Sequence, residues 1–233
     1  MKISCVWEHN GSDSILHASS YVGAYTRGET KDIALQKMAG EIVSYLKWKG
    51  EALPDALEVM IVQEKASGLM ISDADSDVLF EEERKTLSGV EYEELKALAL
   101  KSAQDFLDLY EAIPDREKSC LPVRMTFYGQ VPRTASEMYE HTKNVNDYYF
   151  GEIGVETDHE GTIVECRQRG FAMLESQPDF LENIVYPGSY GEEWSLRKVL
   201  RRFIWHDRIH AKAMYRMAVK TFGGGIPDPF RFV

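Results

Sequence analysis

The sequence predicts an α+β protein, with a small N-terminal α/β domain followed by a four-helix bundle. Short β-branched and apolar runs separated by turn residues occupy residues 1–66. An acidic, serine-containing stretch follows at residues 67–89. From residue 90 to residue 233, four long segments carry apolar residues at steps of three and four, with no strand-like run between them. We therefore expect an α/β domain at 1–66, a connector at 67–89 and a bundle at 90–233.

The N-terminal domain is predicted to contain one helix and several strands. Thr30 is a good N-cap, and apolar residues recur after it at helical spacing until Gly50. Glycine readily adopts the left-handed backbone that ends helices. Strands are expected at residues 2–8, 14–19 and 56–63, and residues 23–27 could form a further short strand before the helix.

The stretch at 67–89 has the composition of an exposed connector. Between residues 51 and 100 there are 13 acidic and 4 basic residues, a net charge of −9. The apolar residues 78–80 could pack back on one domain. Asp73, Asp75 and Asp77 have the spacing that opens a calcium loop, but Val78 stands where such a loop needs glycine, so we reject a calcium site.

The bundle is predicted to contain four helices that begin and end at recognisable signals. Thr134-Ala135-Ser136-Glu137 forms a capping box that opens the second helix. A glycine run at residues 223–225 terminates the fourth. The other three helices are expected at about residues 92–112, 161–176 and 193–222.

Three of the six histidines fall on the predicted inward stripes of this bundle. His206 and His210 are four residues apart and share one helix face, and His141 lies on the stripe of the second helix. Three buried imidazoles destabilise a core unless each has a partner, and one divalent ion satisfies all three. Hydrogen-bonded structural histidines are the alternative. We favour a metal site, with at least one open coordination position.

Two motifs carry a resemblance to a known family. Residues 133–141 (RTASEMYEH) place a histidine partway along the second helix. Residues 193–200 (EWSLRKVL) lead to the HxxxH of residues 206–210. In these motifs residues 90–222 resemble the DinB superfamily. The resemblance implies a four-helix bundle with a long-connection topology and a histidine triad that binds nickel, zinc or a similar ion. It also implies dimerisation through the bundle, and a metal that activates the thiol of a low-molecular-weight cofactor. Where the family often has a further histidine or glycine, residues 211–213 are Ala-Lys-Ala. This departure leaves the three ligands intact and weakens the likeness only at the neighbouring substrate pocket.

The N-terminal domain carries a second resemblance. Residues 28–35 (GETKDIAL) and 45–48 (YLKW) are similar to the HicB-like antitoxin fold. This resemblance implies an α/β module with a protein partner, and no catalytic histidine of the toxin type.

Three further side chains are candidate accessory groups. Tyr148 lies two turns after His141 and could hydrogen-bond a metal-bound ligand or pack in the core. Glu137 could orient the His141 ring or cap its helix. Cys166 could be a fourth ligand, a nucleophile or an inert buried thiol. In each case we favour the structural role.

The three-histidine site predicts a divalent-metal centre, and the DinB resemblance implies that it serves a transferase acting on a small-molecule substrate or thiol cofactor. The alternative is a non-catalytic, metal-holding bundle with an α/β protein-interaction module, and the sequence leaves open whether the site is catalytic. The net charge of −11 argues against a nucleic-acid partner. No apolar run is long enough to span a membrane. An early charge at Glu8 and three widely spaced cysteines favour a cytoplasmic location.

Overall fold

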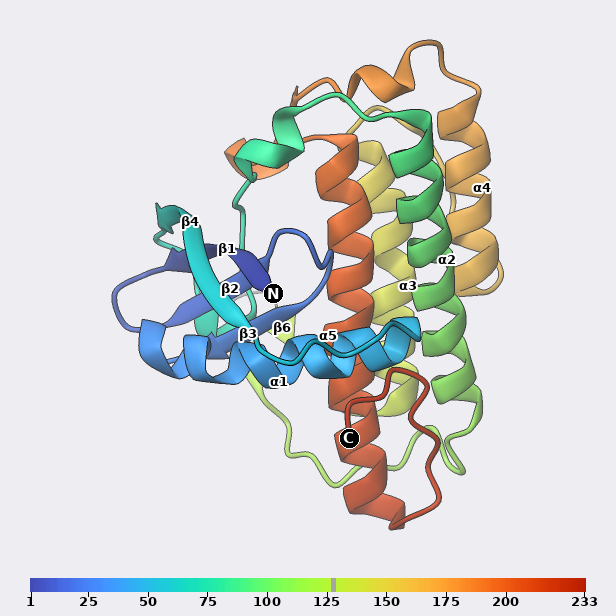
Figure 1. Cartoon of the computed structure of the whole chain (residues 1–233). Coiled ribbons are helices and arrows are strands. Elements are labelled where there is room, and N and C mark those ends of the chain that lie inside the picture. Colours follow the sequence, from blue (N-terminus) through green and yellow to red (C-terminus); the bar gives the residue numbers. More distant parts are fainter. Residues whose placement is uncertain (127–128) are drawn as a thin grey trace.

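A four-stranded sheet and a helix bundle lie side by side in the computed structural model, which describes residues 1–126 and 129–233 (Figure 1). The mixture of helices and strands confirms the α+β class. The strand order is β3-β2-β1-β4, with β1 antiparallel to β2, β2 antiparallel to β3 and β4 parallel to β1. The elements of this unit are β1 (Lys2–His9), β2 (Ser14–Ala18), β3 (Tyr25–Gly28), α1 (Lys31–Lys49) and β4 (Glu58–Ala66).

Helix α1 begins and ends as the sequence predicts. The Thr30 side chain accepts a hydrogen bond from the backbone N–H of Ile33. Gly50 adopts φ 72°, in the left-handed region, and its N–H bonds to the carbonyl of Leu46. These two caps satisfy backbone groups that a helix end leaves free. Along the chain, helix α1 connects β3 to β4.

Four helices form the bundle: α2 (Gly89–Glu111), α3 (Ala135–Gly151), α4 (Ile163–Glu175) and α5 (Leu196–Phe222). Helix α5 packs against α2 and α3, and α4 packs on the other side of the same two helices. Reciprocal capping boxes open α2, α3 and α4, with Thr134 and Glu137 at the start of α3.

The connections between these helices contain short strands, so the expectation of a purely helical C-terminal region is wrong. Strand β5 (Met125–Thr126) pairs with β6 (Gly129–Gln130), and β7 (Tyr186–Pro187) pairs with β8 (Glu193–Trp194). The fourth helix consequently begins at Leu196 instead of residue 193, because Glu193 and Trp194 are extended. Ser195 caps α5 through the backbone N–H of Lys198.

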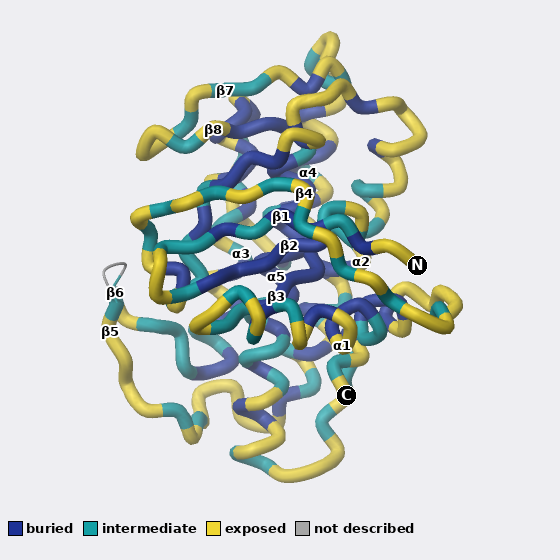
Figure 2. The backbone as a smooth tube through the Cα atoms, turned by 60° about the vertical axis from the view of Figure 1, so that its left-hand side comes forward, coloured by how far each residue is buried: buried dark blue, intermediate teal, exposed yellow. Residues whose placement is uncertain are grey.

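Helix α5 belongs to the bundle and also packs against the sheet unit. One continuous apolar core contains Ile3 and Leu16 from the sheet together with Phe106 and Phe203 from the bundle. Figure 2 shows buried backbone running through β1, β2 and α5, whereas β4 at the sheet edge is largely exposed. Gly23 lies so close to α5 that a Cβ there would overlap the Ile204 side chain.

The segment 67–89 is packed along part of its length, which differs from the expected exposed connector. Val78 and Phe80 are buried against Val6 of β1. Glu83 forms a buried ion pair with Arg201 of α5. Apolar and paired residues therefore hold this acidic segment on both the sheet and α5. The division into parts at residues 66 and 89 remains a prediction.

Within the described residues, no helix combines the length and the apolar character that crossing a membrane requires.

Candidate metal centre

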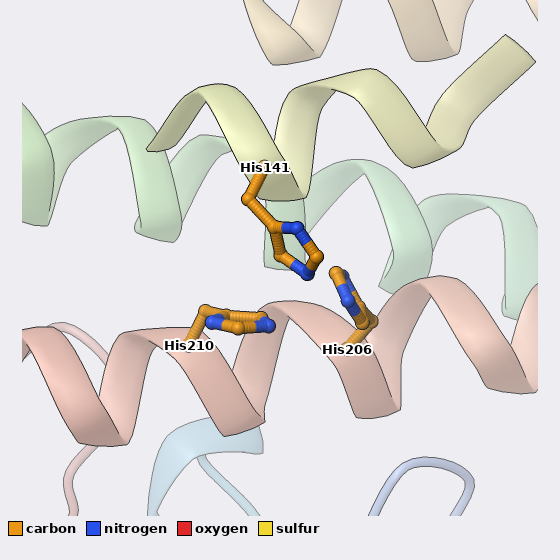
Figure 3. Close-up of side chains that lie close together, drawn as sticks. All are labelled: His141, His206 and His210. Carbon is orange, nitrogen blue, oxygen red and sulfur yellow. The ribbon is translucent and has the colours of Figure 1, made fainter. Parts of the chain in front are cut away.

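Two neighbouring helices bring the three predicted histidines together (Figure 3). His206 and His210 lie one turn apart on α5, with ring centroids separated by 4.5 Å. His141 projects from α3, and its ring centroid is 5.1 Å from that of His206 and 4.7 Å from that of His210. One ring nitrogen of each residue lies within 4.8 Å of the others. These residues form a group that could hold a metal ion.

The position of His141 differs from the prediction. The sequence places it on the inward stripe of its helix, but the residue is exposed. The buried face of α3 instead carries Met138, Thr142, Asn146 and Tyr149. Steps of three and four from Met138 lead equally well to His141 or to Thr142. The structure buries the series that continues through Thr142, one residue later than predicted. His141 therefore stands at the edge of α3 that faces α5, between the core and solvent.

Desolvation lowers the pKa of all three imidazoles and so favours their neutral form. His206 is almost fully buried, and its pKa is held well below the ordinary value by desolvation and then by the charges of His210 and His141. The pKa of His210 is lowered to about 3 by burial and by the charges of His141 and Arg27. Partial desolvation lowers the pKa of His141 as well. Neutral rings have a free nitrogen lone pair, which is the form that binds divalent metals.

The buried Nδ1 of His206 has no hydrogen-bond partner among the described residues. An unpartnered polar atom in a protein interior costs about 1–3 kcal/mol. Metal coordination is one way to satisfy a ring nitrogen in such surroundings. The donor set therefore fits a borderline divalent ion such as nickel or zinc, for which imidazole is a common ligand.

The candidate accessory residues lie in other environments. The Glu137 carboxylate accepts hydrogen bonds from the backbone N–H groups of Arg133 and Thr134, at 2.8 and 3.0 Å, so it caps α3. Tyr148 packs against Trp194, with ring centroids 6.0 Å apart. The Cys166 thiol donates to the carbonyl of Glu160 at 3.3 Å, and burial raises its pKa. None of these three contacts involves a histidine of the group.

Tyr149 is a neighbour of the site that sequence reasoning missed. It is buried, and its ring lies edge-on to His206 with centroids 6.1 Å apart. Once the stripe of α3 is counted through Thr142 and Asn146, Tyr149 is the residue on the core face.

A buried ion pair fixes α5 beside the histidines. The Arg167 guanidinium of α4 donates to both carboxylate oxygens of Asp207, at 2.5 and 3.1 Å, and both side chains are fully buried. The same guanidinium donates to Asn146 of α3 and to the carbonyl of Ala99 in α2. Because Asp207 follows His206 directly, this pair joins all four bundle helices next to a candidate ligand.

Comparison with known proteins gives no relative for this arrangement. No family model, curated protein or solved structure matches the chain. The DinB and HicB resemblances therefore stay predictions that rest on the motifs themselves, and the functional argument rests on the site.

Proposed function

We propose that this protein is a divalent-metal-dependent enzyme in which His141, His206 and His210 hold one nickel or zinc ion. The observation that carries the proposal is the convergence of three imidazole nitrogens, from two helices, within 4.8 Å of one another. The unpartnered Nδ1 of buried His206 supports it. Three protein ligands are typical of catalytic sites, since they leave a coordination position for a substrate.

We further propose transfer of a low-molecular-weight thiol as the reaction class, on the DinB resemblance. A metal of this kind supplies Lewis acidity, which favours the deprotonated form of a thiol or water beside it. The chain's own contribution is to hold the rings neutral and in place. The buried pair of Arg167 and Asp207 fixes α5, and Tyr149 packs against His206.

A non-catalytic metal-holding protein with an α/β interaction module is the second candidate. Strand β4 favours it, because β4 is an edge strand whose Met60 and Val62 side chains are 37% and 55% exposed. An exposed edge strand with apolar side chains is a template for pairing with another chain. Under this alternative the metal would stabilise the bundle without reacting.

Thiol conjugation separates the two candidates. Nickel- or zinc-loaded protein is incubated with a small thiol and an electrophile at neutral pH, and the thioether product is measured. The proposal expects turnover above the rate with free metal, and its loss in His206→Ala. His159→Ala is the matched control, because His159 is exposed and bonds only to Asp147 among the described residues. A metal-loaded protein with no turnover over a panel of thiols and electrophiles would favour the non-catalytic alternative.

A further inference from the structure

Glu8 of β1 carries a carboxyl group with no exposed surface. Two donors bind it: the Ser76 hydroxyl, 2.5 Å from Oε2, and the backbone N–H of Asp77, 3.3 Å from Oε1. Within residues 1–126 and 129–233, no ion pair includes Glu8. A buried carboxylate without a counter-ion is costly, so these surroundings favour the protonated acid.

The basic side chains around Glu8 are bound to other acceptors. Lys65, which lies opposite Glu8 on β4, pairs with Asp77 at 2.6 Å. The three cations of α5 bind elsewhere as well: Lys198 to Glu192, Arg201 to Glu83, and Arg202 to the carbonyl of Ser76. His17 of β2 lies 3.5 Å from the Ser76 hydroxyl, and burial and then these cations hold the pKa of His17 well below its ordinary value. His17 therefore stays neutral and supplies no counter-charge to Glu8.

The protonation of Glu8 depends on its cover. Burial raises the pKa of Glu8 to about 7, the Ser76 hydroxyl lowers it in part, and the Asp77 carboxylate raises it again through a hydrogen bond and its charge. An uncovered Glu8 would have the ordinary carboxyl pKa of 4.5. Protonation therefore stabilises the covered state, and that stabilisation is complete below pH 4.5 and is lost as pH rises through 7.

The cover of Glu8 is the segment 71–80. Its Val78 and Phe80 are buried against Val6, which neighbours Glu8 on the same face of β1. The segment contains one turn of 3-10 helix, Ile71–Asp73, and no strand. Side chains from other elements hold its carbonyl groups at 2.8–2.9 Å: Arg27 bonds to Ser72, Arg202 to Ser76, Lys198 to Asp77 and Arg201 to Val78. Because no sheet ladder or long helix runs through it, the segment can leave the surface without breaking either.

Segment 71–80 also covers part of α5 beside the histidine group. Ile71 and Ala74 pack in one apolar cluster with Trp205 and Ile209. Trp205 directly precedes His206, and Ile209 directly precedes His210. Movement of the segment would therefore uncover residues that adjoin two of the candidate ligands.

We propose that segment 71–80 is a pH-sensitive switch, closed while the Glu8 carboxyl is protonated and opening locally when Glu8 loses its proton to solvent. Opening hydrates the carboxylate, separates it from the Asp77 carboxylate and uncovers α5 beside the histidine group. The switch needs no bound metal, so it stands apart from the proposed function.

Hydrogen exchange of the amides in segment 71–80 tests this proposal. The backbone N–H groups of Asp73, Ala74 and Asp75 form hydrogen bonds that protect them in the closed state. Exchange is followed by mass spectrometry between pH 5 and 8, and each rate is corrected for the intrinsic pH dependence of exchange. Protection is expected to fall about 10–100-fold over this range, as the two carboxyl pKa values allow. At every pH, a peptide from α2 should exchange more slowly than segment 71–80, because the opening is local.

Variants assign the pH dependence to Glu8. Glu8→Gln keeps the size of the side chain but cannot ionise, so protection of the segment should change less than about threefold between pH 5 and 8. Glu58→Gln removes a carboxyl from an exposed position of β4 and should keep the wild-type pH dependence. Asp77→Asn removes the charge beside Glu8, so the fall in protection should be smaller and should end at a lower pH. The Asp77 side chain is 34% exposed, which keeps the test decisive if Glu8→Gln does not fold.

Three results would overturn the switch. The first is protection of segment 71–80 in wild type that does not change with pH. The second is a fall in Glu8→Gln, or in Asp77→Asn where Glu8→Gln does not fold, that equals the fall in wild type. The third is exchange of the segment as slow as that of α2, because the segment would then open only when the whole chain unfolds.

Discussion

Breaking the buried ion pair between Arg167 and Asp207 should destabilise the bundle strongly. Asp207→Asn keeps the size of the side chain but removes the charge opposite Arg167, and neither side chain is exposed to solvent. Removing one partner of a buried pair costs about 3–5 kcal/mol, because the other charge is left unpaired in the interior. For a chain of this size, such a loss lowers the melting temperature by about 6–20 °C.

Urea denaturation followed by circular dichroism measures this effect. Asp158→Asn is the matched control. Asp158 pairs at a solvent-exposed position with Arg169, which lies on α4 as Arg167 does. That variant should be indistinguishable from wild type, since exposed pairs are screened by water. Replacing Arg167 and Asp207 together by leucine should recover most of the lost stability. If Asp207→Asn costs no more than its exposed control, the pair does not hold α5 in place and the reasoning is refuted.

Three further predictions concern packing, pH and partners. Gly23→Ala should lose about 1–3 kcal/mol in urea titrations, because its Cβ would overlap Ile204 and the backbone has φ +91°. Gly11→Ala, with φ +89° and open space, should lose only the smaller backbone contribution. Burial raises the pKa of Glu8 from 4.5 to about 7, so its contribution to stability is complete below pH 4.5 and is lost as pH rises through 7. The free energy of unfolding of Glu8→Gln should therefore rise relative to that of wild type between pH 5 and 8. A constant difference in unfolding free energy across that range would contradict the assignment. With a net charge of −11, the protein should show no gel shift with DNA or RNA at physiological salt, and a salt-sensitive micromolar complex would show this wrong.

Local signals in the sequence predicted most of the fold. Thr30, Gly50 and the capping box from Thr134 to Glu137 mark helix ends through hydrogen bonds within a few residues, and the structure places the ends there. The fourth helix was predicted three residues too long because Glu193 and Trp194 pair with β7, which lies six to eight residues earlier in the chain. The prediction did not recognise this short hairpin.

The candidate site was predictable in part, because spacing along one helix is also a local signal. The spacing of His206 and His210 fixes their common face, so their proximity follows from helix geometry. The exposure of His141 did not follow, because two stripes one residue apart fit the apolar pattern of α3. The pairing of Arg167 with Asp207, and the packing of segment 67–89 on α5, depend on contacts between residues far apart in sequence. The only sequence signal of the pair between Arg167 and Asp207 was that each charged residue lies three or four positions from apolar residues of its own helix.

Metal content in wild type and His141→Ala tests the central claim most directly. Purified protein is loaded with nickel or zinc, desalted and measured by elemental analysis against protein concentration. The account predicts about one ion per chain in wild type, because three neutral imidazoles converge there, and little in His141→Ala, because the two ligands left on α5 hold an ion weakly against water. His159→Ala should keep the wild-type content. Equal metal content in wild type and His141→Ala would contradict the three-histidine site and remove the basis of the proposed enzyme.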